Sequence, residues 1–333
     1  MKTTAVLGAG SWGTALAVHL ARAGHGVRLW ARDAALVEEL RASKVNGRYL
    51  PDVRLADAIS PTASLATALD GARFVVVAVP SHGLRAVVRS SLPHLEPGAI
   101  VVSTTKGIET DTLRRMSQVI DDETDGCCRT VVLSGPSFAA EVARGLPTAV
   151  LAASSDETAA AAVQEHFRGH GLRLYANSDV PGVEIGGALK NVIAIAAGVV
   201  EGLNLGHNAL AALITGGLAE ISRLANAEGG RRDTLSGLSG LGDLVLTCTG
   251  DLSRNRRVGI ELGRGRTIEQ ILSGMRMVAE GVRTTGAALA LGEKHGIELP
   301  IAAQMKAVLD GRCSPAEAVE VLMLRRQRAE VDG

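Results

Sequence analysis

A glycine-rich loop close to the start of this 333-residue chain restricts its fold more than any other feature. An apolar run at residues 4–7 leads into the sequence GAGSWG at 8–13, and a helical pattern follows. A G-x-G-x-x-G loop between a strand and a helix is typical of dinucleotide-binding domains. We expect Gly8 to form the tight turn, Gly10 to let the backbone approach a pyrophosphate, and Gly13 to let helix and strand pack closely. The alternative is a tight turn without a ligand.

The first half of the chain alternates short apolar runs with helical patterns. Continuous apolar strands of this kind are buried on both faces, so the pattern predicts an α/β fold with a Rossmann-type, doubly wound parallel sheet. The predicted strands are residues 4–7, 27–30, 74–79, 100–103, 131–134 and 148–152, with helices at 12–23 and 34–41 among them.

From Pro181 onward the sequence shows helical patterns and no convincing strand. The predicted helices are residues 182–200, 208–228, 233–247, 255–264, 267–273, 284–295, 301–311 and 315–324. We therefore expect a Rossmann-like NAD(P)-binding domain at residues 1–180 and an all-α substrate-binding and catalytic domain at residues 181–333.

The composition argues against several classes of protein. The 35 basic and 35 acidic residues balance and only 2% of residues are aromatic, which disfavours nucleic-acid binding. The apolar run at 185–200 is short and carries a lysine, so we expect no membrane span. The four cysteines lack metal-ligand spacing and no secretory signal is visible. We predict a cytoplasmic protein without a metal.

The end of the second strand bears on the choice of cofactor. NAD-binding domains usually carry an acid there, which holds the ribose 2′-hydroxyl. Ala31 stands at about that position, and Arg32 follows where it could contact a 2′-phosphate. We therefore favour NADP(H), while Asp33 keeps NAD(H) open. An ordinary surface arginine is the alternative for Arg32.

A single lysine, Lys190, lies in the otherwise uncharged run at 185–200, between Glu184 and Glu201. Burial of a lysine removes hydration from its charged form and lowers its pKa, so the amine can accept a proton. Lys190 is therefore a candidate general base. The alternative is a lysine whose ammonium extends out of the helix to solvent.

Further residues, in four places along the chain, are candidates for the same site. Ser253 can cap a helix whose first turn contains Arg254 and Asn255, and an arginine at that end favours a bound anion such as phosphate. Asp243 lies in a largely apolar segment and needs a partner, for which Lys190 is the natural choice. Lys106 follows the strand at 100–103, and Glu280 is expected at the cofactor edge. For Arg254 and its neighbours the alternative is a basic helix face in water. For Lys106 the alternative is a solvated charge on a loop.

The sequence Ser134-Gly135-Pro136-Ser137 follows a strand and opens a helix, as a nucleophile turn would. It lacks the flanking glycines of a hydrolase elbow, and no histidine has a supporting acid nearby in the sequence. A hydrolase is therefore disfavoured.

Seven blocks together closely resemble the bacterial NAD(P)-dependent glycerol-3-phosphate dehydrogenases, from Gly8 to Leu324. They are GAGSWGTALA (8–17), TKGIE (105–109), SGPSFAAEVARGLPTA (134–149), GGALKNVIAIAAG (186–198), GLGDLVLTCT (240–249), SRNRRVG (253–259) and VAEG (278–281). The lysine and SRNR blocks are the specific ones, because the glycine loop occurs in many dehydrogenases. The chain departs from the family at Leu210 and Gly216, where the family usually has basic residues.

The resemblance implies reversible hydride transfer between NAD(P)H and C2 of dihydroxyacetone phosphate, which gives sn-glycerol 3-phosphate for phospholipid synthesis. It implies that Lys190 moves the proton at the C2 oxygen. The implied substrate contacts are Lys106, Gly135, Ser137, Lys190, Asp243, Ser253, Arg254 and Asn255. The expected cofactor contacts are Gly8, Gly10, Ser11, Trp12, Gly13, Arg32, Lys106, Ala139, Arg254, Val278 and Glu280.

Two other functions stay open at this point. One is a related reductase that acts on a different hydroxy acid or phosphorylated sugar. The other is a non-catalytic NADP-binding sensor, which would not need the set of Lys190, Asp243 and Arg254. A homodimer is also open, because small residues near Lys190 share a helical face that permits close packing within or between subunits.

Overall fold

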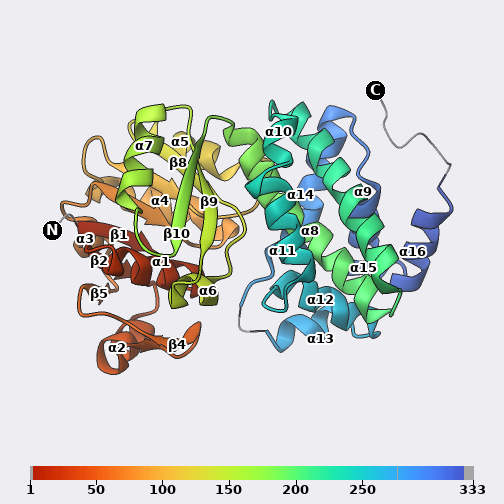
Figure 1. Ribbon diagram of the computed structural model, residues 1–333, viewed down its shortest axis with the longest axis horizontal. Helices are drawn as coiled ribbons and strands as arrows, with labels where there is room; N and C mark the ends of the chain where they lie inside the picture. Colours follow the sequence, from red (N-terminus) through yellow and green to blue (C-terminus); the bar gives the residue numbers. More distant parts are fainter. Residues whose placement is uncertain (1–2, 276, 326–333) are drawn as a thin grey trace.

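The structure is a computed structural model that describes residues 3–275 and 277–325. An α/β region is followed by a helical region, and the two lie side by side (Figure 1). The outer ends of the two predicted domains, residues 1–2 and 326–333, and residue 276 lie outside the described residues. The expected fold class, a Rossmann-type sheet followed by helices, is confirmed.

The α/β region is built on a sheet with the strand order β10-β9-β8-β7-β6-β1-β2-β5. This order places β1 beside β2 on one side and β6 on the other, which is the switch point where doubly wound sheets bind ligands. The strands are β1 (Thr3–Leu7), β2 (Gly26–Trp30), β5 (Ile59–Thr62), β6 (Phe74–Val77), β7 (Ile100–Ser103), β8 (Arg129–Ser134), β9 (Thr148–Ala153) and β10 (Leu172–Asn177).

One pair of strands departs from the parallel arrangement. β9 runs antiparallel to β8, whereas the other neighbouring pairs in this sheet are parallel. A parallel connection needs a crossover that returns over the sheet. The helix between β8 and β9, α6 (Ala139–Arg144), is short and packs on α1 (Ser11–Arg22) instead, so the chain re-enters the sheet in the opposite direction.

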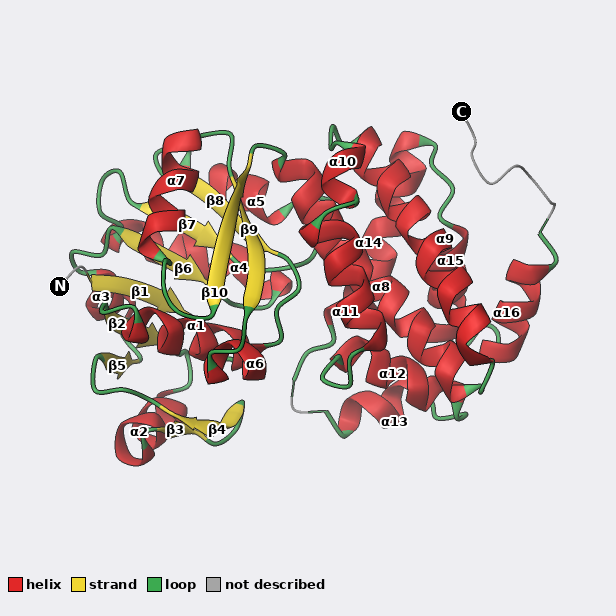
Figure 2. Ribbon diagram, viewed as in Figure 1, coloured by secondary structure: helices red, strands yellow, loops and turns green. Residues whose placement is uncertain are grey.

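Helices cover both faces of the sheet (Figure 2). One face packs against α1 (Ser11–Arg22), α2 (Ala34–Ser43), α6 and α7 (Glu157–His166). The other packs against α3 (Leu65–Leu69), α4 (Ser81–Ser91) and α5 (Met116–Thr124). Along β1 the side chains alternate between these two cores, Val6 on the first and Ala5 and Leu7 on the second. A small hairpin, β3 (Val45–Asn46) with β4 (Leu50–Arg54), follows α2.

The edge strands β5 and β10 were not predicted. β10 is largely exposed, so it lacks the continuous apolar pattern of the central strands. β5 contains Pro61, which a sheet accepts at its edge because proline cannot donate a backbone hydrogen bond.

The helical region is organised around α8 (Val180–Gly202), which packs against α9, α11, α12 and α14. α8 is long and apolar enough to cross a membrane, but the apolar window is entirely buried among the other elements, as in a core helix. The other helices are α9 (Gly206–Ala227), α10 (Arg232–Leu235), α11 (Asp243–Thr249), α12 (Arg254–Gly263), α13 (Ile268–Ser273), α14 (Glu280–His295), α15 (Pro300–Leu309) and α16 (Pro315–Met323).

The predicted helix at 233–247 is interrupted. α10 and α11 are separated by a π-helical turn, Leu238–Gly242. Gly240 approaches the backbone of Leu235 so closely that a Cβ there would lie 2.0 Å from the Leu235 carbonyl oxygen. The glycine-rich turn lets the chain change direction, and it makes Asp243 the first residue of α11.

A buried polar cluster joins the two regions. The carboxylate of Glu184, on α8, accepts hydrogen bonds from the backbone and hydroxyl of Ser117 at 2.7 and 2.6 Å. It also pairs with Arg115 Nη1 at 2.6 Å. The cluster attaches α8 to the start of α5. The last strand ends at Asn177 and α8 begins at Val180, and the division into domains at residue 180 remains a proposal.

Candidate active site

The loop from β1 to α1 has the geometry of a phosphate-binding turn. Gly8 has φ +116°, and a Cβ on Gly13 would lie 1.9 Å from the Gly8 carbonyl oxygen, so both positions require glycine. Around Gly10 the Cβ position is open. Gly10 also caps α1 without a side-chain hydrogen bond, which leaves the amides of the first turn available to an anion.

Lys190 lies at the centre of α8 and is buried. Its Nζ donates to Asp243 Oδ1 at 2.5 Å and to Thr247 Oγ1 at 2.8 Å. Desolvation lowers the pKa of Lys190 to about 7, with a further lowering by Lys106 and an opposing contribution from Asp243. The ammonium therefore stays inside the protein, and its pKa is that of a group able to give or take a proton near neutral pH.

Asp243 joins two lysines from different regions of the chain. Its side chain is 1% exposed, and its Oδ2 accepts from Lys106 Nζ at 2.5 Å while Oδ1 accepts from Lys190. Lys106, on the loop after β7, also donates to the carbonyl of Gly135 at 3.1 Å. One carboxylate between two ammonium groups leaves a net positive charge, which favours loss of a proton and attracts an anion.

The turn from β8 to α6 carries two of the predicted substrate residues and one predicted cofactor residue. Ser137 Oγ donates to the carbonyl of Gly135 at 3.0 Å, so its hydroxyl is directed to a backbone oxygen rather than to a histidine base. This agrees with the interpretation that a hydrolase is disfavoured. Ala139 is the first residue of α6, and the turn meets Lys106 through Gly135.

The three predicted substrate residues at the start of α12 have different contacts. Ser253 caps the helix by accepting from the amide of Arg256 at 3.2 Å. Within the described residues Arg254 has no hydrogen bond or ion pair of its own, so its guanidinium is available to a ligand. Asn255, in contrast, is buried and internally bonded: it donates to Asn191 Oδ1 at 2.9 Å and accepts from the Gly281 amide at 3.0 Å.

Two predicted cofactor residues lie where the helical region meets the sheet. Glu280, the first residue of α14, accepts from the amide and hydroxyl of Ser81 at 3.0 and 2.6 Å. Ser81 begins α4, after β6, so the Glu280 carboxylate lies at a helix N-terminus near the switch point. Val278 lies two residues before Glu280, and the sulfur of Met277 lies 3.3 Å from Ser11 Oγ.

Two further predicted cofactor positions follow the first two strands, β1 and β2. Trp12 lies in the first turn of α1 and is partly buried. Arg32 follows β2 and is exposed, with no hydrogen bond or ion pair among the described residues.

Sequence reasoning missed Thr247 and Asn191. Thr247 accepts from Lys190, and its hydroxyl donates to the backbone carbonyl of Asp243 at 2.6 Å. Its position four residues after Asp243 on one helix is a signal that could have identified it. Asn191 receives the side chain of Asn255 directly beside Lys190, a contact between distant segments with no local signal.

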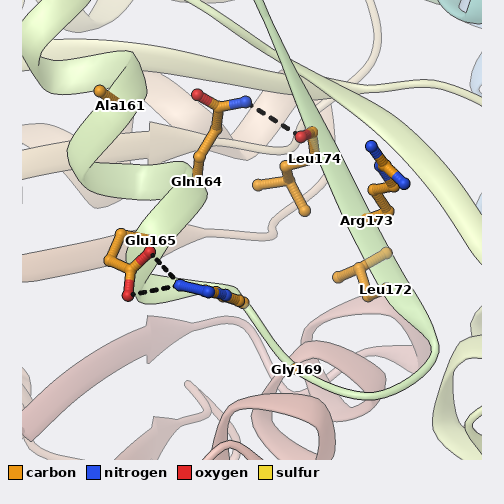
Figure 3. A pocket seen from close by; sticks show the side chains of 8 residues that line it. Ala161, Gln164, Glu165, Gly169, Leu172, Arg173 and Leu174 are labelled. Carbon is orange, nitrogen blue, oxygen red and sulfur yellow. Dashed lines mark hydrogen bonds and ion pairs between the residues drawn. The ribbon is translucent and has the colours of Figure 1, made fainter.

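A hollow of about 460 Å³ lies elsewhere, between α7 and β10 (Figure 3). Its lining includes the Glu165–Arg168 pair and Gln164, which donates to the Leu174 carbonyl. None of the predicted site residues lines it. In the described part of the chain, no group of three His, Cys, Asp or Glu side chains could hold a metal ion.

Two family models match the chain. Residues 3–160 match the NAD-dependent glycerol-3-phosphate dehydrogenase N-terminus, and residues 179–320 match the C-terminus of the same family. The chain belongs to the NAD-dependent glycerol-3-phosphate dehydrogenase family. The family membership expected from the sequence is thereby confirmed.

Curated relatives agree over the full length. The chain is 53% identical to "Glycerol-3-phosphate dehydrogenase [NAD(P)+]" of Koribacter versatilis over 335 residues, which covers 99% of each chain. A relative of the same name from Geobacter sulfurreducens is also 53% identical and covers 98% of each.

Solved structures give the same fold. A crystal structure of glycerol-3-phosphate dehydrogenase from Coxiella burnetii matches with a TM-score of 0.94 and 41% identity, covering 97% of this chain and 99% of that one. A ketopantoate reductase from Ralstonia eutropha matches with a TM-score of 0.59 at 17% identity, which shows a shared fold alone.

Proposed function

We propose that this chain is an NAD(P)-dependent sn-glycerol-3-phosphate dehydrogenase that interconverts dihydroxyacetone phosphate and glycerol 3-phosphate. Its family membership supports the reaction class. The observation that carries the proposal is the buried cluster in which Asp243 accepts from both Lys106 and Lys190. The cluster combines a proton-transfer group with positive charge in a site shielded from water.

The chain's residues fit the dinucleotide. The turn at Gly8 and Gly13 and the uncapped first turn of α1 suit a pyrophosphate. Arg32, exposed and unpaired in the described part of the chain, suits a ribose 2′-phosphate, and we propose NADP(H) as the favoured cofactor. When bound, the cofactor supplies or accepts the hydride. Trp12, Ala139, Val278 and Glu280 are proposed to contact it.

Lys190 is the proposed proton-transfer residue. In the reductive direction it donates a proton to the C2 oxygen of dihydroxyacetone phosphate, and in the oxidative direction its neutral amine takes the hydroxyl proton. Lys106 stabilises negative charge at the same oxygen. Asp243 positions both amines, and Thr247 gives Lys190 a second fixed partner.

The substrate phosphate is proposed to bind at the start of α12. Arg254 supplies the guanidinium, and the N-terminus of α12, with Ser253 as its cap, favours an anion. Asn255 is internally bonded in this structure, so its proposed part is to hold α12 against α8 and α14 beside the phosphate. Binding of the remote phosphate aligns C2 with Lys190.

The test is oxidation of NADPH and of NADH by the purified protein with dihydroxyacetone phosphate. We expect turnover with this substrate and none with 2-oxo acids or with unphosphorylated dihydroxyacetone. Turnover of a 2-oxo acid in preference to the phosphate would identify a different reductase. Cofactor binding without oxidation by any ketone phosphate would identify a sensor.

Cellular placement and assembly are proposals of the same kind. We propose a cytoplasmic enzyme that supplies glycerol 3-phosphate for phospholipid synthesis. A homodimer is proposed as well, and sedimentation of the purified protein measures its mass directly.

A further inference from the structure

The β3–β4 hairpin is attached to the cofactor loop by polar contacts. The side chain of Asn46 donates to the carbonyl of Ala9 at 2.9 Å and to Thr14 Oγ1 at 2.8 Å. Ser11 Oγ donates to the carbonyl of Tyr49 at 2.8 Å. The hairpin is therefore part of the wall beside the glycine loop, and the residue at its tip, Arg48, is held next to the end of β2.

Arg48 connects the tip of the hairpin to two carboxylates. Its Nη1 pairs with Asp33 at 2.8 Å and its Nε pairs with Glu39 at 2.9 Å. Asp33 also caps α2 by accepting from the amide of Ala35 at 2.9 Å. The acid that could hold a ribose hydroxyl is thus already bonded on two sides.

The charges at this point balance. Arg32 and Arg48 are cations, and Asp33 and Glu39 are anions. Desolvation raises the pKa of Asp33, but hydrogen bonds from Ala35, Leu36 and Arg48 lower it by more, so the group is ionised at neutral pH. Removal of Arg48 would leave two carboxylates against one guanidinium.

A 2′-phosphate carries a charge of about −1.5 to −2 at neutral pH, and a 2′-hydroxyl carries none. The sign of the local charge therefore decides between NADP(H) and NAD(H) at this end of the cofactor. With Arg48 in place, these four groups sum to zero, and the 2′-phosphate meets a neutral surface that includes the exposed guanidinium of Arg32. Without it, the phosphate meets a net negative surface.

We infer that Arg48 is a cofactor-selectivity residue that offsets part of the negative charge of Asp33 and Glu39, so that a 2′-phosphate is accepted beside Arg32. This inference rests on the dinucleotide-dependent activity proposed above. Arg48 acts here by pairing with the carboxylates, and the 2′-phosphate is held by Arg32.

Binding of two nucleotide fragments to the protein tests this without hydride transfer. The probes are 2′,5′-ADP, which carries the 2′-phosphate, and 5′-ADP, which lacks it. We expect Arg48→Met to weaken 2′,5′-ADP about fivefold, which corresponds to about 1 kcal/mol, with 5′-ADP unchanged. Because the groups are half exposed, the effect should shrink as salt is added.

A second substitution separates neutralisation from direct contact. Asp33→Asn removes the carboxylate and keeps the helix cap, since asparagine caps as well as aspartate. Added to Arg48→Met, it should restore most of the affinity for 2′,5′-ADP. If the double variant stays as weak as Arg48→Met, Arg48 contacts the phosphate itself and the inference is wrong.

Two controls guard against loss of structure. Arg48→Lys retains the charge and should retain the preference, whereas equal weakening of both fragments in Arg48→Met would overturn the inference. Arg41→Met changes an arginine that pairs with Glu38 on the same helix, and it should leave both affinities unchanged. If the wild type binds the fragments but does not reduce dihydroxyacetone phosphate, the proposed function fails while the Arg48 test still stands.

Discussion

Two aspartates, one in the proposed substrate site and one beside the proposed cofactor site, differ mainly in how far their side chains are exposed to solvent. Asp243 has a side chain that is 1% exposed and lies between Lys106 and Lys190. Asp33 has a side chain that is 52% exposed and pairs with Arg48. Both are carboxylates bonded to cations, yet the partner of the first, Lys190, is buried, and desolvation lowers its pKa to about 7 although Asp243 opposes that shift.

The difference shows that exposure to solvent determines how strongly two similar ion pairs act. Water screens the Asp33–Arg48 pair, so the interaction energy of the pair is small. We expect it to change only the relative affinity for the two cofactors. The Asp243 cluster is desolvated, so its charges act strongly on one another and on any proton between them. The predictions below test this contrast, beginning with the largest effect.

Replacement of Lys190, in the buried cluster, should have the largest effect on activity. Lys190→Met removes the proton-transfer group, and we expect kcat to fall about a thousandfold, within the usual range for a lost general acid or base. The measurement is the rate of NADPH oxidation with saturating dihydroxyacetone phosphate, together with the Kd of NADPH, which should not change. Lys294→Met, at the exposed end of α14, is the matched control. A variant with near wild-type kcat would rule out the assignment.

Replacement of Asp243 should lower kcat about a hundredfold and move its pH dependence. Asp243 raises the pKa of Lys190, so in Asp243→Asn that pKa should fall below about 7. Lys190 must be protonated to act as the acid, so the loss of reductive kcat with rising pH should begin at a lower pH than in the wild type. The pH profile of kcat checks this, and an unmoved profile would contradict the role of Asp243.

The Arg115–Glu184 pair tests whether burial alone makes a pair strong. Arg115→Met leaves the buried Glu184 with Ser117 alone, and we expect a loss of about 3 kcal/mol in the free energy of unfolding. Burial raises the pKa of Glu184, opposed by the charge of Arg115. Without Arg115 that pKa rises further, so protonation at lower pH relieves the buried charge and the stability deficit should shrink as pH falls.

Urea unfolding of the full chain at two pH values measures this effect. Arg115→Met combined with Glu184→Gln should recover part of the stability, because position 184 then carries no buried charge without a cation beside it. A deficit that grows at lower pH would refute the argument.

Arg254 tests a cation that has no hydrogen bond or ion pair among the residues that the structure describes. Arg254→Ala should raise the KM for dihydroxyacetone phosphate about tenfold, as expected for a lost charged hydrogen bond to phosphate. Steady-state kinetics at fixed NADPH gives the value. An unchanged KM would count against phosphate binding at α12.

The smallest effect is expected at a fully solvated pair. Glu165, near the end of α7, and Arg168, two residues beyond the last residue of that helix, are 73% and 74% exposed. Glu165→Gln should change the free energy of unfolding by less than about 0.5 kcal/mol. If the free energy of unfolding fell as much as in Arg115→Met, burial could not be the reason why buried and exposed ion pairs differ.

Much of the sheet domain is predictable because its signals are local. The glycine loop and the apolar runs at β1, β2, β6, β7, β8 and β9 indicated a Rossmann-type sheet, and the long apolar stretch around Lys190 indicated a buried helix. The edge strands β5 and β10 and the break between α10 and α11 were missed. Edge strands lack the apolar pattern, and a glycine-rich turn can continue or interrupt a helix depending on its neighbours.

The site shows the same division between local and distant information. Residue types and motif order pointed to Lys190, Lys106, Asp243 and Arg254. The sequence could not indicate that Asn255 bonds to Asn191 and Gly281, because an asparagine at a helix start suits a ligand and an internal contact equally well.

The sequence by itself determined the family, the dinucleotide loop and the lysine at the centre of an apolar helix, because each is recognised from short continuous segments of the chain. Only the tertiary structure decided that one carboxylate serves two lysines, 53 and 137 residues away, and that Arg48 pairs with Asp33 beside Arg32. The physical reason is that burial and charge pairing depend on which segments pack together. Local periodicity specifies the segments but not the partners they meet.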